Sequence, residues 1–331
     1  MTQNPVLSIN DLSIEFPVYK GAVKALNGVS LHVNEGEIVG VVGESGSGKS
    51  VTSMMAMKLL PEGSYRVTQG DISILGTDII HASEKTMRTL RGGDVAMIFQ
   101  EPMTALNPTR KIGIQMTDVI RLHRRLDNDA ARQLAISLLK DMHIADPEST
   151  LQRYPFELSG GMRQRVLIAL AFSCNPRLII ADEPTTALDV TVQKQVLMLL
   201  KAKARELKTA ILFITHDMAV VSQFCDRVYV MYAGSLVEAG STRQVLHAPR
   251  HPYTRGLMAA LPELATPGSQ LQAIPGNVPD LSRLPAGCAF ASRCPSRSDK
   301  CNQKPVLTSI HEATTHQVAC WHPALQEELA V

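Results

Sequence analysis

The sequence contains no apolar stretch of about 18 residues, the shortest that a helix needs to span a bilayer. Its first five residues also lack the cationic segment and apolar core of a secretory leader. We therefore expect a protein of the cytosol, which reaches a membrane by docking onto another subunit. The net charge of +2 argues against a nucleic-acid surface, whose affinity would come from phosphate neutralisation. Nucleic acid is thus not an expected partner.

Internal repeats and low-complexity segments are absent as well. The composition, 45% hydrophobic and 19% charged residues, is that of an ordinary globular protein, and 331 residues suffice for two or three compact units. Cysteine is scarce except near the C-terminus, where four of the six cysteines gather: Cys288, Cys294, Cys301 and Cys320. In a reducing compartment such a cluster indicates a metal site before disulfides.

Hydrophobic periodicity predicts the order of the secondary structure. Apolar and polar residues alternate over 7–16 and 29–33, which predicts an antiparallel β layer with turns at Gly21 and at Asn27-Gly28. Further strands are predicted at 38–42, 71–75, 95–99, 178–181 and 210–214, and helices at 51–60, 162–173 and 192–207, with a helical insert over 117–142. Alternation of strand and helix predicts a parallel sheet. Prolines beyond Gly240 predict a loop-rich appendage rather than more sheet.

The predicted strand 38–42 leads into a glycine-rich segment, Gly43-Glu44-Ser45-Gly46-Ser47-Gly48-Lys49-Ser50. Its glycines let the backbone turn N–H groups inward, and the following helix adds the positive end of its dipole. We predict a phosphate loop here, in which Lys49 reaches the β/γ-phosphates of a nucleotide and Ser50 ligates Mg²⁺. The preceding strand disfavours the alternative, an ordinary glycine- and serine-rich surface loop.

Two further motifs point to phosphate chemistry. Asp182 and Glu183 follow the strand 178–181, at the kind of strand end where open parallel sheets bind ligands. Asp182 would hold the Mg²⁺ hydration shell, and Glu183 would orient and deprotonate the water that attacks the γ-phosphoryl group. A solvated strand end is the alternative for this acidic pair. Ser159, Gly160 and Gly161 precede a predicted helix and form a second candidate anion site.

Over about residues 7–250 the ordered motifs resemble the ATP-binding-cassette (ABC) ATPase family. The resemblance rests on the phosphate loop, the acidic pair and the signature segment Leu158-Ser159-Gly160-Gly161-Met162-Arg163-Gln164. It implies that the signature of one subunit closes over the γ-phosphate of ATP in its partner's phosphate loop, so that two subunits form two composite sites. Glu183 is present rather than substituted, so we expect a hydrolytically competent subunit.

The resemblance also implies roles for four residues outside these motifs. Gln100, after the strand 95–99, resembles the family's glutamine that senses Mg²⁺. His216 resembles the family's switch histidine, which contacts the γ-phosphate. The segment Ala187-Leu188-Asp189 resembles the family's loop that crosses the dimer interface, which gives Asp189 its expected role. Phe16 resembles the aromatic residue that stacks on adenine. Ordinary alternatives are a turn glutamine, a structural histidine, a helix cap and a core phenylalanine, with Tyr19 as the rival for adenine.

About residues 245–323 resemble the extension of oligopeptide and dipeptide transporter ATPases. The resemblance rests on His251-Pro252-Tyr253-Thr254, on Ile274-Pro275-Gly276 and on the segments around the four cysteines. It implies that Cys288, Cys294, Cys301 and Cys320 hold a [4Fe–4S] cluster with a structural role. The cysteine spacing alone leaves zinc and metal-free thiols open. His322 could be an additional or substitute ligand, but an ordinary surface histidine is the favoured interpretation.

We therefore predict an α/β fold: a P-loop, RecA-like ABC ATPase core with an antiparallel β subdomain and a helical subdomain. The expected division is residues 1–245 for the ATPase, with the helical part at about 101–160, and 246–331 for the extension. The expected cofactors are ATP and Mg²⁺. The resemblance implies a peripheral subunit at the cytoplasmic face of a bacterial inner membrane, with a second and different ATPase subunit, two permease subunits and an extracytoplasmic binding protein as partners.

The resemblance gives the cargo as dipeptides or oligopeptides, with D-amino-acid dipeptides as one branch. Nickel and glutathione are the alternative cargoes. A soluble ABC ATPase of translation or DNA repair, an exporter ATPase and a non-catalytic scaffold are the alternative functions. Tandem cassettes, long charged arms and a coiled-coil insertion, which a soluble ABC ATPase would predict, do not occur in the sequence.

Overall fold

The computed structural model describes residues 5–186, 188–261, 273–310 and 315–324. The chain forms two compact units. The first comprises Met1–Val6, Val33–Glu37 and His81–Phe213, and the second Leu7–His32, Ile38–Ile80 and Ile214–Val331. Strand β8 (Ala210–Thr215) therefore begins in the first unit and ends in the second.

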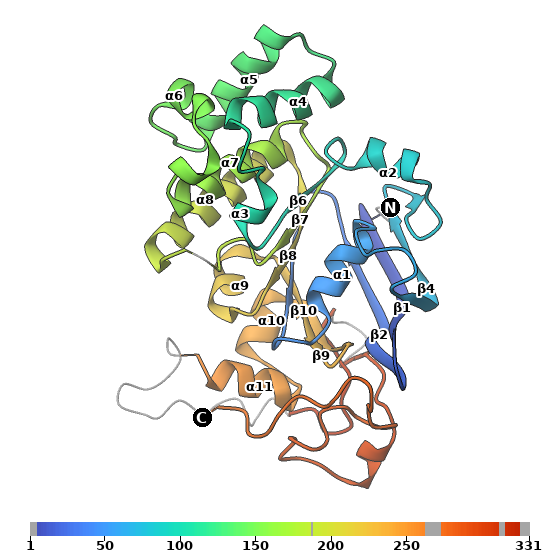
Figure 1. Ribbon diagram of the computed structural model, residues 1–331. Coiled ribbons are helices and arrows are strands. Elements are labelled where there is room, and N and C mark those ends of the chain that lie inside the picture. The colour runs from blue at the N-terminus through green and yellow to red at the C-terminus, as the bar shows by residue number, and fades with distance from the viewer. Residues whose placement is uncertain (1–4, 187, 262–272, 311–314, 325–331) are drawn as a thin grey trace. The chain divides into compact units, whose positions relative to one another are not determined.

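The first unit combines a parallel strand pair with helices (Figure 1). β6 (Val95–Ile98) pairs in parallel with β7 (Leu178–Asp182), and every residue of β7 is buried. The helices are α2 (Glu84–Leu90), α3 (Pro102–Ala105), α4 (Ile112–Arg124), α5 (Asn128–Asp141), α6 (Pro147–Gln152), α7 (Gly160–Phe172) and α8 (Val190–Leu207). α4, α5 and α6 pack on one another, and α7 contacts α5 and α8.

The helical pattern over 117–142 proves to be two helices. α4 ends at Arg124, and the next residue, Arg125, caps the helix with a left-handed φ of 53°. Asp127 then caps α5, because its side chain accepts the backbone N–H of Ala130 at 2.8 Å. The apolar positions remain in phase across the break, so periodicity alone does not reveal it.

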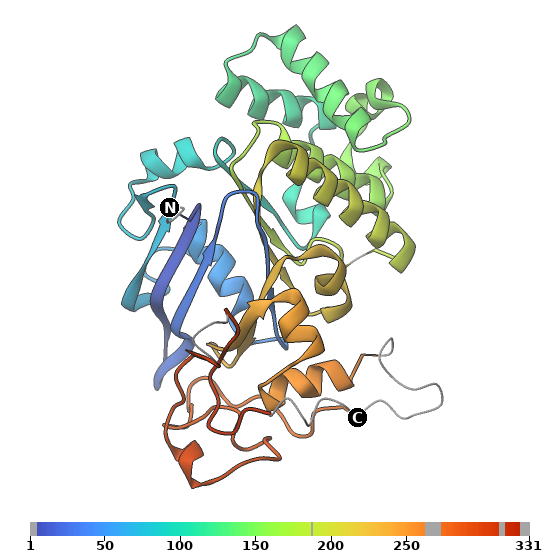
Figure 2. The same ribbon diagram turned by 180° about the vertical axis from the view of Figure 1, so that it is seen from behind.

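The second unit contains two sheets. In one, the order is β2-β1-β4-β5, formed by β1 (Leu7–Val18), β2 (Gly21–Val33), β4 (Arg66–Ile74) and β5 (Thr77–Asp78). In the other, β3 (Ile38–Val42) pairs in parallel with β9 (Arg227–Tyr232), and β9 pairs antiparallel with β10 (Ser235–Ser241). The helices are α1 (Lys49–Ala56), α9 (Met218–Phe224), α10 (Thr242–His247) and α11 (Pro252–Ala259). Figure 2 shows α10, α11 and the loops of residues 273–310 from behind.

Two local expectations for the second unit need correction. Asn27-Gly28 is not a turn but lies inside β2, where Gly28 has a φ of 74°. The appendage is rich in loops, as predicted, yet it also adds sheet. β12 (Gln317–Val318) pairs with β10, and β11 (Thr308–Ser309) pairs with β12, because the edge of β10 offers backbone groups for pairing.

Candidate functional site

The phosphate loop, residues 43–50, joins β3 to α1 in the second unit. Gly48 has a φ of 104°, which favours glycine, and it stands directly before α1. A Cβ atom on Gly43 would lie 2.1 Å from the carbonyl oxygen of Met231, so the loop backbone approaches β9 too closely for a side chain. Both glycines are thus required by the local backbone, as the sequence predicts. Ser45 and Gly46 are exposed at the tip of the loop.

The polar groups of this loop fit an anionic ligand. Lys49 is only 5% exposed, and its Nζ donates to the carbonyl oxygens of Gly43 at 2.8 Å and Glu44 at 3.0 Å. Ser47 Oγ is buried and has no hydrogen-bond partner among the described residues. Ser50 is exposed in the first turn of α1. A buried ammonium, an unsatisfied hydroxyl and a helix start are the groups that bind phosphate.

Other predicted residues of the second unit lie around strand ends. His216 is exposed and directly follows β8, and Asp217 caps α9 by accepting the backbone N–H of Ala219 at 2.8 Å. Phe16 is half-buried in β1, whereas Tyr19, in the turn after that strand, is 98% exposed. The adenine contact and the switch role therefore stay predictions.

In the first unit, the acidic pair stands at the end of β7. Asp182 is the last residue of the strand and is 5% exposed. Glu183 has a φ of 45°, a left-handed conformation that is uncommon outside glycine and concentrates at functional sites. Its Oε2 accepts Gln100 Nε2 at 3.3 Å and Thr186 Oγ1 at 3.1 Å. The structure thus brings Gln100 and Glu183 together, and it adds Thr186, which the sequence reasoning missed.

The signature segment forms the start of α7. Ser159 is exposed, and its Oγ accepts the backbone N–H of Met162 at 3.3 Å. Gly160 and Gly161 are the first residues of the helix, and a Cβ on Gly161 would meet Val192 of α8 at 2.8 Å. Small residues therefore let the starts of α7 and α8 approach each other.

Asp189 lies at the start of α8, beside the signature segment. It caps α8, because its side chain accepts the backbone N–H of Val192 at 3.0 Å. The capping alternative is thus real, and a second role at a dimer seam stays a prediction. Ala187, in the same predicted loop, lies outside the described residues.

The four C-terminal cysteines influence one another electrostatically. Burial, with the charges of the three others as a smaller cause, raises the pKa of the Cys320 thiol to about 11. Burial also raises the pKa of Cys288 and Cys294. Within the part of the chain that the structure describes, no three or more His, Cys, Asp or Glu side chains group closely enough to hold a metal ion.

The structure therefore does not support the predicted [4Fe–4S] cluster on Cys288, Cys294, Cys301 and Cys320. His322, for which a surface histidine is the favoured interpretation, is half-buried, and its Nε2 forms a hydrogen bond with Ser298 Oγ.

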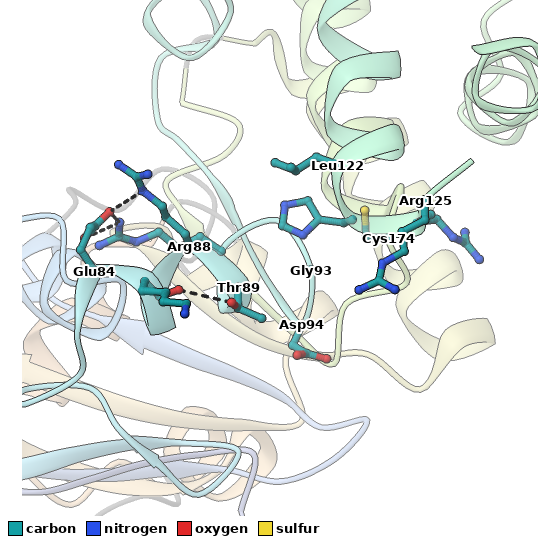
Figure 3. A pocket seen from close by; sticks show the side chains of 12 residues that line it. Glu84, Arg88, Thr89, Gly93, Asp94, Leu122, Arg125 and Cys174 are labelled. Carbon is teal, nitrogen blue, oxygen red and sulfur yellow. Dashed lines mark hydrogen bonds and ion pairs between the residues drawn. The ribbon is translucent and has the colours of Figure 1, made fainter. Parts of the chain in front are cut away.

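A cavity of about 1140 Å³ in the first unit carries a strongly basic lining (Figure 3). Its lining comprises Glu84, Lys85, Arg88, Thr89, Arg91, Gly93, Asp94, Leu122, His123, Arg124, Arg125 and Cys174. Glu84 pairs with Arg91 at 3.0 Å and with Arg88 at 3.7 Å. None of the predicted site residues belongs to this lining, so the cavity is separate from the acidic pair and the signature segment.

Comparison with known proteins identifies both parts of the chain. Residues 26–186 match the ABC transporter family, and residues 237–301 match the C-terminal region of oligopeptide/dipeptide transporters. Over the full length of both proteins, the chain is 61% identical to a probable D,D-dipeptide transport ATP-binding protein, DdpD, of Escherichia coli (strain K12). It is 48% identical to the oligopeptide transport ATP-binding protein OppD of Bacillus subtilis (strain 168), over 96% of this chain and 89% of that protein.

A solved structure agrees with these relatives. It is the dimeric post-hydrolysis state of an ATP-binding cassette bound to ADP and Pi, with a TM-score of 0.64 and 26% identity. The alignment covers 72% of this chain and 99% of the cassette. The predicted ABC ATPase fold and its use of ATP and Mg²⁺ are confirmed. In the described residues, every helix is too short or too polar to cross a bilayer. The chain belongs to the family of ATP-binding subunits of oligopeptide and dipeptide ABC import systems.

Proposed function

We propose that this chain hydrolyses ATP to drive the uptake of D-amino-acid dipeptides. The phosphate loop supports the ATPase role, through the buried ammonium of Lys49 and the unsatisfied Ser47 hydroxyl. Full-length identity of 61% with a probable D,D-dipeptide transport ATP-binding protein supports this cargo class over longer peptides, nickel or glutathione. We also propose the division into an ATPase part, residues 1–245 with a helical part at about 101–160, and an extension, 246–331.

In the second unit, the backbone N–H groups of residues 43–48 bind the phosphates, and Lys49 binds the β/γ-phosphates. The Ser50 hydroxyl would serve as a Mg²⁺ ligand, Phe16 would stack on adenine, and His216 would contact the γ-phosphate. In the first unit, Asp182 and Gln100 offer the oxygen ligands that Mg²⁺ prefers. Bound Mg²⁺ neutralises charge on the phosphates.

Glu183 is the general base for the attacking water. Gln100 and Thr186 donate to one of its carboxylate oxygens, at 3.3 and 3.1 Å, and thereby fix its orientation. Ser159, Gly160, Gly161 and Asp189 serve the nucleotide of a partner subunit. Ser159, Gly160 and Asp189 are exposed, and all four lie at the starts of α7 and α8, where the helix dipoles favour negative charge.

The proposed partners are a second, different ATPase subunit, two permease subunits and, indirectly, an extracytoplasmic binding protein. The proposed location is the cytoplasmic face of the inner membrane. The [4Fe–4S] cluster is no part of this proposal, since the described residues do not support it. Iron, sulfide and zinc determination on anaerobically purified protein measures directly whether the four cysteines hold a metal.

Affinity capture of the tagged chain from membranes, followed by reconstitution with the captured subunits, tests the proposal. We expect ATP-dependent uptake of D-alanyl-D-alanine, with weaker uptake of L-alanyl-L-alanine, nickel and glutathione. Preferential uptake of longer L-peptides would contradict the cargo. Recovery of the chain without any permease would contradict the import role.

A further inference from the structure

The extension contacts the phosphate loop through one arginine of the second unit. Arg293 Nη1 donates to Glu44 Oε2 at 2.7 Å, and Nη2 donates to Oε1 of the same carboxylate at 3.1 Å. Glu44 is the second residue of the phosphate loop. Arg293 is 9% exposed and the Glu44 side chain 28% exposed, so the guanidinium side of this two-pronged ion pair is shielded from water. Such parallel donation is the strongest arrangement of a guanidinium and a carboxylate.

The extension fixes the guanidinium of Arg293 on its other sides. Its Nε donates to the carbonyl oxygen of Pro275 at 2.9 Å, and Nη2 donates to that of Ile274 at 3.2 Å. Nη1 also donates to Tyr232 Oη at 3.3 Å. The side chain therefore has a single well-defined position, which is set by the backbone of residues 274–275. Hydrogen bonding to Glu44 raises the pKa of Arg293 further, so it stays charged.

A second residue of the extension, Tyr253, contacts the phosphate loop at Glu44. Tyr253 Oη accepts the backbone N–H of Glu44 at 2.8 Å. The tyrosine is fully buried, and its ring packs against Tyr232 and Phe290, with centroids 4.7 and 5.5 Å away. Both the main chain and the side chain of Glu44 are thus anchored by residues of the extension.

The position of Glu44 creates an electrostatic problem for a phosphate site. The ammonium of Lys49, the group assigned to the β/γ-phosphates, lies 3.0 Å from the carbonyl oxygen of Glu44. An uncompensated carboxylate on this residue would repel a nucleotide, since like charges at short range interact unfavourably. The paired Arg293 cancels that charge.

We propose that Arg293 is a positioning residue for nucleotide binding, which neutralises Glu44 and, with Tyr253, holds the first turn of the phosphate loop in its binding conformation. The inference rests on the assignment of this loop to ATP. It makes the extension a component of the nucleotide site. Loss of the extension's contacts would then weaken ATP binding even though every residue of the phosphate loop remained.

The test is MgATP binding by the purified full-length chain, measured by calorimetry at low and high salt. We expect Arg293→Gln to raise Kd about tenfold, because it leaves the carboxylate of Glu44 unpaired near the proposed phosphate site. Glu44→Gln should bind more tightly than wild type, because it removes a negative charge. The double variant Arg293→Gln/Glu44→Gln should recover most of the lost affinity. Arg293→Lys, which keeps the charge, should bind MgATP better than Arg293→Gln.

The matched control is Arg297→Gln, at an exposed arginine of the same loop, and it should bind MgATP as wild type does.

Each outcome bears on the proposal. Equal Kd values for wild type and Arg293→Gln overturn it. A double variant as weak as Arg293→Gln means that Arg293 acts only through the fold of the extension, which overturns the neutralising role. Glu44→Gln leaves the contacts of Arg293 with residues 274–275 and the contact of Tyr253 with the backbone of residue 44 in place, so weaker binding by this variant contradicts the neutralising role. Absence of MgATP binding by the wild type refutes the proposed function instead.

Discussion

Gln100 Nε2 donates to Glu183 Oε2 at 3.3 Å, although 83 residues separate the two in the sequence. Thr186 Oγ1 donates to the same oxygen at 3.1 Å. The left-handed backbone of Glu183, with a φ of 45°, turns this residue out of the line of β7. Two donors and a strained backbone thus hold one carboxylate in place, as the proposed role of general base requires.

Glu183→Gln should lower MgATP turnover by about 100-fold or more, because the amide cannot accept the proton of the attacking water. Nucleotide binding should remain within a few-fold of wild type. Phosphate release and nucleotide binding measured on the same preparations separate the two effects. Glu148→Gln, an exposed glutamate of α6, is the matched control and should turn over normally. Undiminished turnover in Glu183→Gln would mean that another group activates the water.

Stability should fall in mild acid because of His251. Its buried ring accepts the backbone N–H of Tyr253 on Nδ1 at 3.0 Å, and burial lowers its pKa from 6.5 to about 4, although nearby Glu238 opposes that shift. Between these two pH values the unfolded chain binds the proton and the folded chain does not. This contribution to stability is therefore intact above pH 6.5 and is lost as the pH falls towards 4, by about 3 kcal/mol in total.

Urea unfolding of wild type and His251→Asn at pH 7 and pH 5 measures this effect. Asparagine caps a helix without titrating, so its urea midpoint should fall less between the two pH values. Other titrating groups are common to both proteins and cancel in the comparison. An equal fall of the midpoint in both proteins would show that His251 does not carry the acid sensitivity.

Gln164 of α7 carries an energetic cost. The side chain is fully buried, and neither polar atom of its amide has a hydrogen-bond partner among the described residues. Gln164→Met keeps the shape and removes the unpaired groups, so it should stabilise the fold by about 1 kcal/mol. Gln115→Met, at a glutamine that bonds Asn107 and Arg110, should destabilise it. A lower urea midpoint for Gln164→Met than for wild type would contradict this account.

The sequence could predict the parts of the site that are local. The phosphate loop is eight consecutive residues, and the acidic pair directly follows an apolar strand, so pattern and spacing suffice for both. Arg293 and Glu44 are 249 residues apart, and Tyr253 and Glu44 are 209 apart. Hydrophobic periodicity cannot predict such contacts, because they depend on how segments distant in the sequence pack together. The pairing of Gln100 with Glu183 likewise has no signal in spacing.

Local signals also failed where packing overrides them. Asn27-Gly28 has the composition of a turn, but the backbone N–H of Asn27 donates to Gly234 at 2.8 Å and that of Gly28 donates to Ser13 Oγ at 2.9 Å. These contacts hold the pair inside β2. The break after α4 had a usable signal in Asp127, a good helix cap, which the uninterrupted apolar periodicity obscured.

The most direct measurement compares wild type with Lys49→Ala in proteoliposomes that contain the assembled importer. Phosphate release and dipeptide uptake are followed together. The buried ammonium of Lys49 is assigned to the β/γ-phosphates, so the account predicts that both rates fall to near background in the variant. Undiminished dipeptide uptake with Lys49→Ala would contradict the claim that ATP bound in this chain's phosphate loop drives transport.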